Sequence, residues 1–141
     1  MIKLNKITDY AIVVLGFLSN KESSSFSTKE ISNQTGIPLP TVSKVCKILS
    51  NSKLLFSERG HQGGYYCKKK PDEISVAKII ETIDGPIAIT ACVDDSNEIC
   101  DTHSTCLLNG NWQQANKAVV AALASVSLKD LLNPENFFSK T

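Results

Sequence analysis

Two short helical segments, separated by a glycine and two prolines, restrict the first half of the chain to a few folds. Ser27 and Glu30 have the spacing of a capping box, which predicts the start of a short helix that ends at Gly36. Beyond a tight connection at 37–40, residues 41–51 predict a third helix, whose apolar positions form one stripe: Val42, Val45, Cys46 and Leu49. Its outward-facing positions are polar or basic: Thr41, Ser43, Lys44 and Lys47. This pattern fits a helix-turn-helix, and an ordinary three-helix bundle explains it equally well.

The segments on either side of this unit favour the DNA-binding interpretation. Residues 8–18 predict a preceding helix, with Thr8 and Asp9 at its start. Residues 54–57 and 65–67 predict two strands around a glycine-rich tip, and a hairpin at this place is the layout of a winged helix. The tip carries the only arginine of the chain, which suits the minor groove of DNA, and glycines that allow close approach to phosphates: Arg59, Gly60, Gly63 and Gly64. A surface arginine on a flexible turn is the alternative.

The charge distribution is uneven along the chain. Residues 1–70 carry eleven Lys or Arg against four Asp or Glu, a net charge of +7, whereas residues 71–141 carry four against ten, a net charge of −6. The overall net charge of +1 therefore conceals a basic half that indicates a polyanion partner, for which double-stranded DNA is the candidate. A chance division of solvated surface charge would give the same numbers.

The second half of the chain predicts two further helices. Ser75 caps one of them, which carries an apolar side formed by Val76, Ile79, Ile80 and Ile83. A longer helix is expected from about Cys106 to Val126, with one apolar stripe: Trp112, Ala115, Val119 and Leu123. So small a domain offers little surface to cover that stripe, so a homodimer is expected, the alternative being a helix folded back on its own domain. The expected division is a winged helix-turn-helix at 1–85, a cysteine loop at 86–106, and a dimerisation helix with its tail at 107–141.

Three cysteines form the strongest chemical pattern: Cys92, Cys100 and Cys106 within fifteen residues of loop composition. Thiolates suit iron–sulfur clusters or zinc, but this spacing lacks the paired knuckles of a zinc ribbon. Thiol redox sensing and inert cysteines remain alternatives. A fourth ligand could come from His103, from Asp9 of either chain, from water or from a small thiol. Cys46 and Cys67 are interpreted as structural.

Together these segments resemble the Rrf family of winged-helix regulators, whose members include IscR-like and NsrR-like cluster sensors. The resemblance covers essentially the whole chain and rests on 6–11, 37–44, 59–65, 74–80 and the three-cysteine loop. Residues 85–88 and 110–113 are similar to the branch that regulates sulfur-mobilisation (SUF) cluster-assembly genes.

The resemblance implies a homodimer with crossing C-terminal helices, a recognition helix at 40–51, a wing bearing Arg59, and a cluster held by the three cysteines. IscR-like members place a histidine where this chain has Asn109, whereas NsrR-like members use an N-terminal aspartate of the other subunit, which Asp9 matches. Asp9 is therefore favoured over His103 as the fourth ligand. A [2Fe–2S] cluster is favoured over [4Fe–4S], and aerobic purification is expected to remove it in some preparations.

The expected function is that of a cluster-sensing, DNA-binding transcription regulator in the cytoplasm, acting as a repressor. The alternatives are a cluster-free regulator responding to thiol oxidation or a metabolite, and a zinc-stabilised interaction module. The longest apolar stretch, 11–18, is far too short to span a membrane, and no secretory signal is recognised. No catalytic triad, Walker loop or dinucleotide fingerprint is found, so we do not expect an enzyme.

Overall fold

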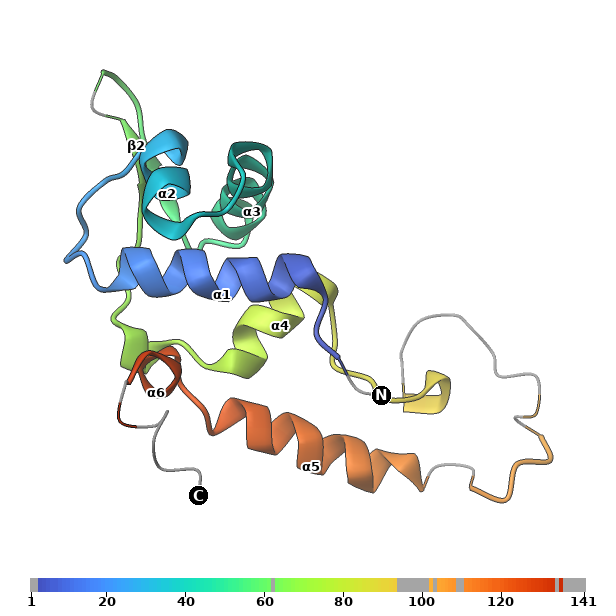
Figure 1. The fold of residues 1–141 in the computed structure, drawn as a ribbon. Coiled ribbons are helices and arrows are strands. Elements are labelled where there is room, and N and C mark those ends of the chain that lie inside the picture. Colours follow the sequence, from blue (N-terminus) through green and yellow to red (C-terminus); the bar gives the residue numbers. More distant parts are fainter. Residues whose placement is uncertain are drawn as a thin grey trace.

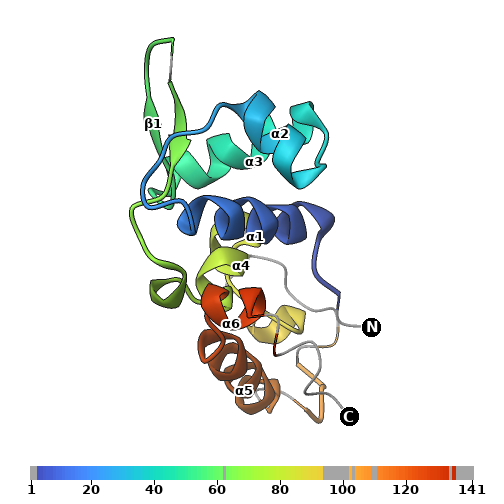
Figure 2. The same cartoon turned by 60° about the vertical axis from the view of Figure 1, so that its left-hand side comes forward.

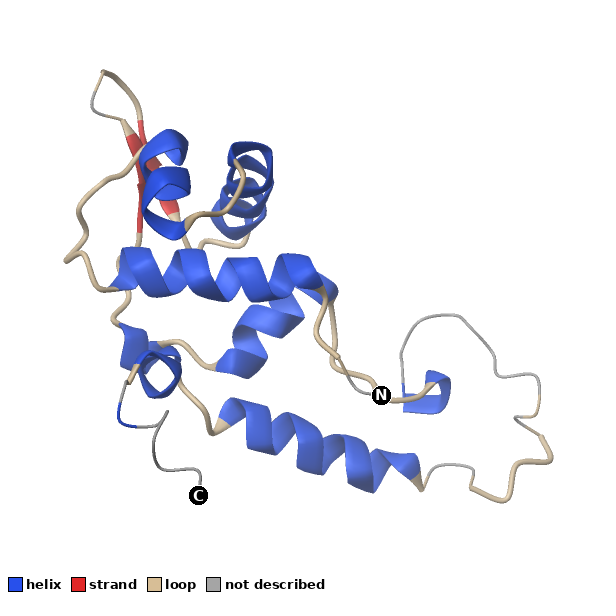
Figure 3. Ribbon diagram, in the orientation of Figure 1, coloured by secondary structure: helices blue, strands red, loops and turns tan. Residues whose placement is uncertain are grey.

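A computed structural model describes residues 3–61, 63–93, 102, 104–108, 111–133 and 135. The described part is mainly helical with one two-stranded antiparallel sheet, as expected for a winged helix (Figures 1 and 3). The elements in chain order are α1 (Lys6–Ser19), α2 (Thr28–Thr35), α3 (Leu39–Asn51), β1 (Phe56–Glu58), β2 (Gly64–Tyr66), the 3-10 helix η1 (Pro71–Glu73), α4 (Val76–Asp84), the 3-10 helix η2 (Ala91–Val93), α5 (Trp112–Ala124) and α6 (Leu128–Leu132). None of the helices in these residues is long and apolar enough to cross a membrane.

Capping side chains explain where α2 begins and why α1 begins earlier than the sequence predicted. The predicted capping box of α2 is present, and Gly36 ends the helix with a φ of 75°, in the left-handed region that glycine adopts without strain. The predicted start of α1 at Thr8 was two residues late, because Asn5 caps the helix by accepting a hydrogen bond from the Ile7 N–H. Thr8 instead lies inside the helix and is fully buried.

The predicted start of α3 at Thr41 was also two residues late. Pro38 takes the N-cap position and Pro40 lies in the first turn, where the missing N–H would have no partner in any helix. The expected buried stripe of α3 is confirmed, since Val42, Val45, Cys46 and Leu49 are all fully buried.

The wing is an antiparallel hairpin that pairs Phe56 with Tyr66 and Glu58 with Gly64. The first strand begins later than the expected 54–57, because Leu54 and Leu55 close the end of α3 and are buried in the core. The second strand ends one residue earlier than the expected 65–67. Phe26 bonds to Tyr65 in both directions, with N···O distances of 2.7 and 2.9 Å, and so anchors the base of the wing.

The hydrophobic core lies where α1 crosses α3 and α4, and α6 closes it from below (Figures 1 and 2). Leu128 of α6 is fully buried in this core. Its N–H donates to the Ile74 carbonyl, and the Val76 N–H donates to the Val126 carbonyl. The C-terminal segment therefore completes the core of the winged helix.

The long helix is shorter than its predicted span from Cys106 to Val126. It begins at Trp112, because Leu107 and Leu108 lie in a turn in which the Asn111 N–H donates to the Leu108 carbonyl. Asn116 is the only buried residue of α5, and all the other α5 residues are exposed or half-buried.

Candidate DNA-binding surface and cysteine segment

The predicted DNA-contacting side chains of α3 lie on the face opposite its buried stripe. Ser43, Lys44 and Lys47 are exposed, and Thr41 is half-buried. The α3 helix and the wing lie at the same end of the molecule, remote from α5 (Figures 1 and 2). The fold therefore presents the two DNA-contacting elements of a winged helix on one side.

Arg59 and Gly60 form the exposed tip of the wing. Gly60 has a φ of 116°, a conformation that side-chain-bearing residues rarely adopt, and its carbonyl accepts a hydrogen bond from the Gly63 N–H. This glycine lets the chain reverse tightly directly after the exposed Arg59.

Gly63 and Gly64 were selected from the sequence for approach to phosphates, but the structure supplies an intramolecular reason for both. A Cβ atom on Gly63 would collide with the carbonyl oxygen of Glu58, and one on Gly64 with the backbone of Phe26. Both glycines therefore let neighbouring backbone segments pass close together.

Lys68 has a position that the sequence did not predict. Its ammonium lies 4.2 Å from the ring centre of Phe56 and 6.0 Å from that of Tyr66, so the base of the wing holds it by a cation–π contact. Phe56 and Tyr66 pair across the two strands, and Lys68 lies two residues beyond Tyr66 in the sequence.

The four described cysteines fall into two kinds of environment. Cys46 and Cys67 are buried, as their structural interpretation requires, and burial raises the pKa of the Cys46 thiol to about 12. Burial also raises the pKa of Cys67. Cys92, in η2, and Cys106 are half-buried, and the Cys92 Sγ lies 3.0 Å from the Thr90 hydroxyl. The two described cysteines of the predicted ligand set are thus the accessible ones.

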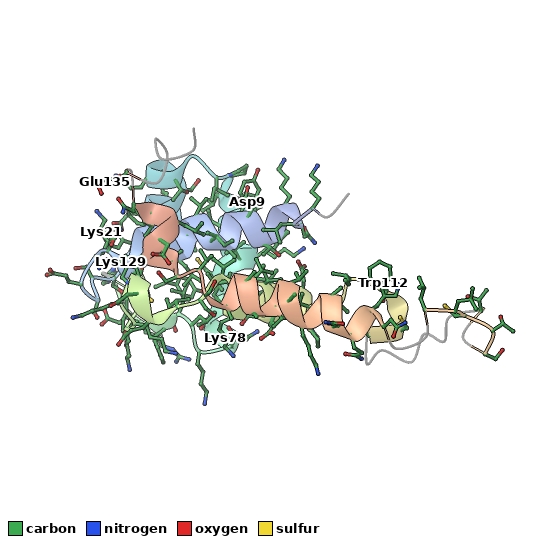
Figure 4. All side chains as sticks on the ribbon, turned by 90° about the horizontal axis from the view of Figure 1, so that it is seen from below. Asp9, Lys21, Lys78, Trp112, Lys129 and Glu135 are labelled. Carbon is green, nitrogen blue, oxygen red and sulfur yellow. The ribbon has the colours of Figure 1, made fainter. Side chains whose placement is uncertain are left out.

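The remaining ligand candidates are distributed as follows. Cys100, His103 and Asn109 lie outside the described residues. Asp9 lies exposed on the first turn of α1, and Trp112 marks the outer end of α5 (Figure 4). Within the described residues, no three His, Cys, Asp or Glu side chains come together as a metal site.

Two partly buried polar contacts were not predicted from the sequence. The Thr8 hydroxyl donates to Asp84 Oδ2 at 2.7 Å and joins α1 to the end of α4. The Asn116 side chain bonds to the backbone of both Ile87 and Ile89. Each contact joins residues far apart in the sequence, so no local pattern indicates it.

A comparison with protein families decides the class of the molecule. The family model described as "Rrf2: Iron-dependent Transcriptional regulator" matches residues 4–134. The chain belongs to the Rrf2 family. It is 28% identical over 131 residues to the regulator IscR of Aliivibrio salmonicida, covering 92% of this chain and 77% of that protein. It is 25% identical over 135 residues to NsrR of Halalkalibacterium halodurans, covering 95% and 92% of the two chains.

A solved structure of another protein has a fold similar to that of this Rrf2 protein. CymR, the global cysteine regulator of B. subtilis, superposes with a TM-score of 0.72 at 26% identity, covering 93% of this chain and 96% of CymR. The Rrf2 chain is therefore a winged-helix DNA-binding transcription regulator and not an enzyme.

Proposed function

We propose that this Rrf2 regulator acts as a homodimer that binds DNA under the control of an iron–sulfur cluster held by Cys92, Cys100 and Cys106. The observation that carries the proposal is the contrast among the cysteines: those predicted as structural are buried, whereas Cys92 and Cys106 are accessible. The family description as iron-dependent supports the same chemistry.

DNA binding would use α3 and the wing of each subunit. Ser43, Lys44 and Lys47 are exposed on α3 and can reach major-groove edges and phosphates, while Arg59 at the wing tip suits the minor groove. Two copies related by a two-fold axis would read a pseudo-palindromic operator. The exposed and half-buried apolar side chains of α5 support a partner copy there.

The cluster site would combine the three thiolates with a fourth ligand. Asp9 is favoured because it is exposed on α1 and thus accessible to a partner subunit, and His103 is the alternative. A bound cluster supplies an iron–thiolate centre that responds to iron supply and oxidants. We propose that the cluster is [2Fe–2S] rather than [4Fe–4S]. We also propose that the protein acts in the cytoplasm as a repressor of SUF cluster-assembly genes.

Likeness to CymR supports a second candidate function, in which the cysteines respond to thiol oxidation or a metabolite without any cluster. Both candidates share the DNA-binding surface and differ in the chemistry at Cys92 and Cys106.

Anaerobic purification of the full chain tests the cluster. Wild-type protein should show visible charge-transfer absorption with equal iron and acid-labile sulfide, and the amount per chain distinguishes the two cluster types. Cys92→Ser, Cys100→Ser and Cys106→Ser should each lose the absorption, because each removes a thiolate ligand. Cys46→Ala should retain it, since that thiol is buried and protonated.

The results that would contradict the cluster proposal each point to a different alternative. Colourless wild-type protein that also resists anaerobic reconstitution would overturn the cluster proposal and favour the thiol sensor, and zinc without sulfide would favour a zinc module. A spectrum unchanged in Asp9→Ala would remove Asp9 from the ligand set.

Arg59→Ala should weaken binding to a duplex that the wild-type protein selects from a random DNA pool. The expected loss is roughly ten-fold or more, because the variant removes a cation from the wing. Lys129→Ala is the matched control, since it removes one positive charge from the exposed surface of α6 and should leave affinity within about two-fold. Equal affinities for Arg59→Ala and wild type, measured by fluorescence anisotropy, would remove the wing from the DNA-binding surface.

A further inference from the structure

Asn116 makes a partly buried polar contact between α5 and the segment that leads to Cys92. Its Nδ2 donates to the Ile87 carbonyl at 2.9 Å, and its Oδ1 accepts from the Ile89 N–H at 3.0 Å. Asn116 is only 9% exposed, although the helix around it is largely accessible. One carboxamide thus satisfies a backbone donor and a backbone acceptor two residues apart.

This contact requires the chemistry of asparagine. A side chain must offer one donor and one acceptor at a short reach from the helix, which the amide of asparagine does. Aspartate has the same shape but would direct an acceptor at the Ile87 carbonyl. Glutamine is one methylene longer and cannot keep the same position without displacing the segment or the helix.

The same segment is anchored at its other end. Asp84, the last residue of α4, accepts the hydrogen bond from the buried Thr8 hydroxyl of α1. Residues 85–89 therefore run between a contact to α1 and a contact to α5, and they line a groove of about 530 Å³ together with Leu4, Ile80, Val119 and Leu123. Cys92 follows Ile89 by only three residues, and η2 itself packs against α5.

We infer that Asn116 is a positioning residue that fixes the Cys92 segment to α5, and so couples the cysteine site to the helix proposed for dimerisation. The inference rests on the proposed function for what Cys92 binds, but the linkage itself is a property of the metal-free chain. Because coupling between sites is reciprocal, ligand binding at Cys92 would favour one placement of α5, and pairing of α5 would favour ligand binding. Without Asn116 this coupling should weaken, because only the packing of η2 against α5 would remain.

The test uses the full-length, metal-free protein under reducing conditions. In Asn116→Ala the Ile89 amide should exchange its hydrogen roughly ten-fold faster or more, because it loses a buried acceptor. The Cys92 thiol should also be alkylated faster, as followed by mass spectrometry of its peptide. Amides within α1, such as that of Leu15, should keep their protection, which separates a local release from general unfolding.

Two further variants sharpen the result. Asn116→Asp retains the acceptor for the Ile89 N–H and loses the donor to Ile87, so its Ile89 exchange should lie between wild type and Asn116→Ala. Gln113→Ala, an exposed position of the same helix, should behave as wild type.

Unchanged Ile89 exchange and Cys92 alkylation in Asn116→Ala would overturn the inference. An equal loss of protection at Ile89 and throughout α1, seen in both Asn116 variants, would also overturn it, because Asn116 would then only stabilise the fold. Iron and sulfide analysis of wild-type protein is the separate test of the proposed function. A negative result in that analysis would not overturn the role of Asn116, and a negative result for Asn116 would not overturn the proposed cluster.

Discussion

Leu128→Ala is expected to lower the free energy of unfolding by about 3 kcal/mol, the usual loss for a fully buried leucine truncated in a core. Leu128 is fully buried although it lies near the C-terminal end of the described chain, and it packs in the same core as Leu15 and Leu49 of α1 and α3. Removal of its side chain would leave a cavity where α6 closes that core. Urea unfolding followed by circular dichroism measures the change.

Leu131→Ala is the matched control, because Leu131 belongs to the same short helix and is 44% exposed. It should cost less than about 1 kcal/mol, since much of its surface is already in water. Equal losses in the two variants would mean that α6 does not contribute to the core as the structure shows.

Gly64→Ala should damage both stability and DNA binding. The added Cβ would meet the carbonyl of Phe26 and lie 2.7 Å from the Ser27 nitrogen, and backbone atoms cannot move aside as a flexible side chain would. The two hydrogen bonds that join Phe26 to Tyr65 must then lengthen or break. We expect a loss of about 2–4 kcal/mol in unfolding free energy and at least ten-fold weaker operator binding, since the wing loses its anchor.

Gly36→Ala is the matched control for this prediction. Gly36 also has a special conformation, with a φ of 75°, but an added Cβ would meet nothing within 4 Å. Its cost should be limited to the left-handed backbone penalty of about 1 kcal/mol. Equal effects of the two substitutions on stability would show that collision with Phe26 does not determine the role of Gly64.

Local signals predicted most of the helical framework. The capping box of α2, the cap at Ser75 and the stripe on α3 act within a few residues, so the sequence displays them directly. The starts of α1 and α3 were each misplaced by two residues because Asn5 and Pro38 serve as caps, a role that several neighbouring residues could have filled.

The contacts that connect the elements could not be predicted in this way. Thr8 and Asp84 are 76 residues apart, and Asn116 lies 27 residues beyond Ile89. Such partners follow from tertiary packing, in which any polar residue on a helix has many candidate partners. For the same reason, the sequence did not indicate the close approach of Gly64 to the backbone of Phe26, and the predicted DNA contact of Gly64 stays a prediction.

The burial of Leu128 also has a consequence for synthesis of the protein. Residues 6–84 contain the whole helix-turn-helix, the wing and α4, yet their core lacks a side chain that is made more than forty residues later. A nascent chain on the ribosome therefore cannot close its core until α5 and α6 have emerged. Because α6 follows α5 in the chain, the core of the winged helix is completed only after the whole of α5 has been made.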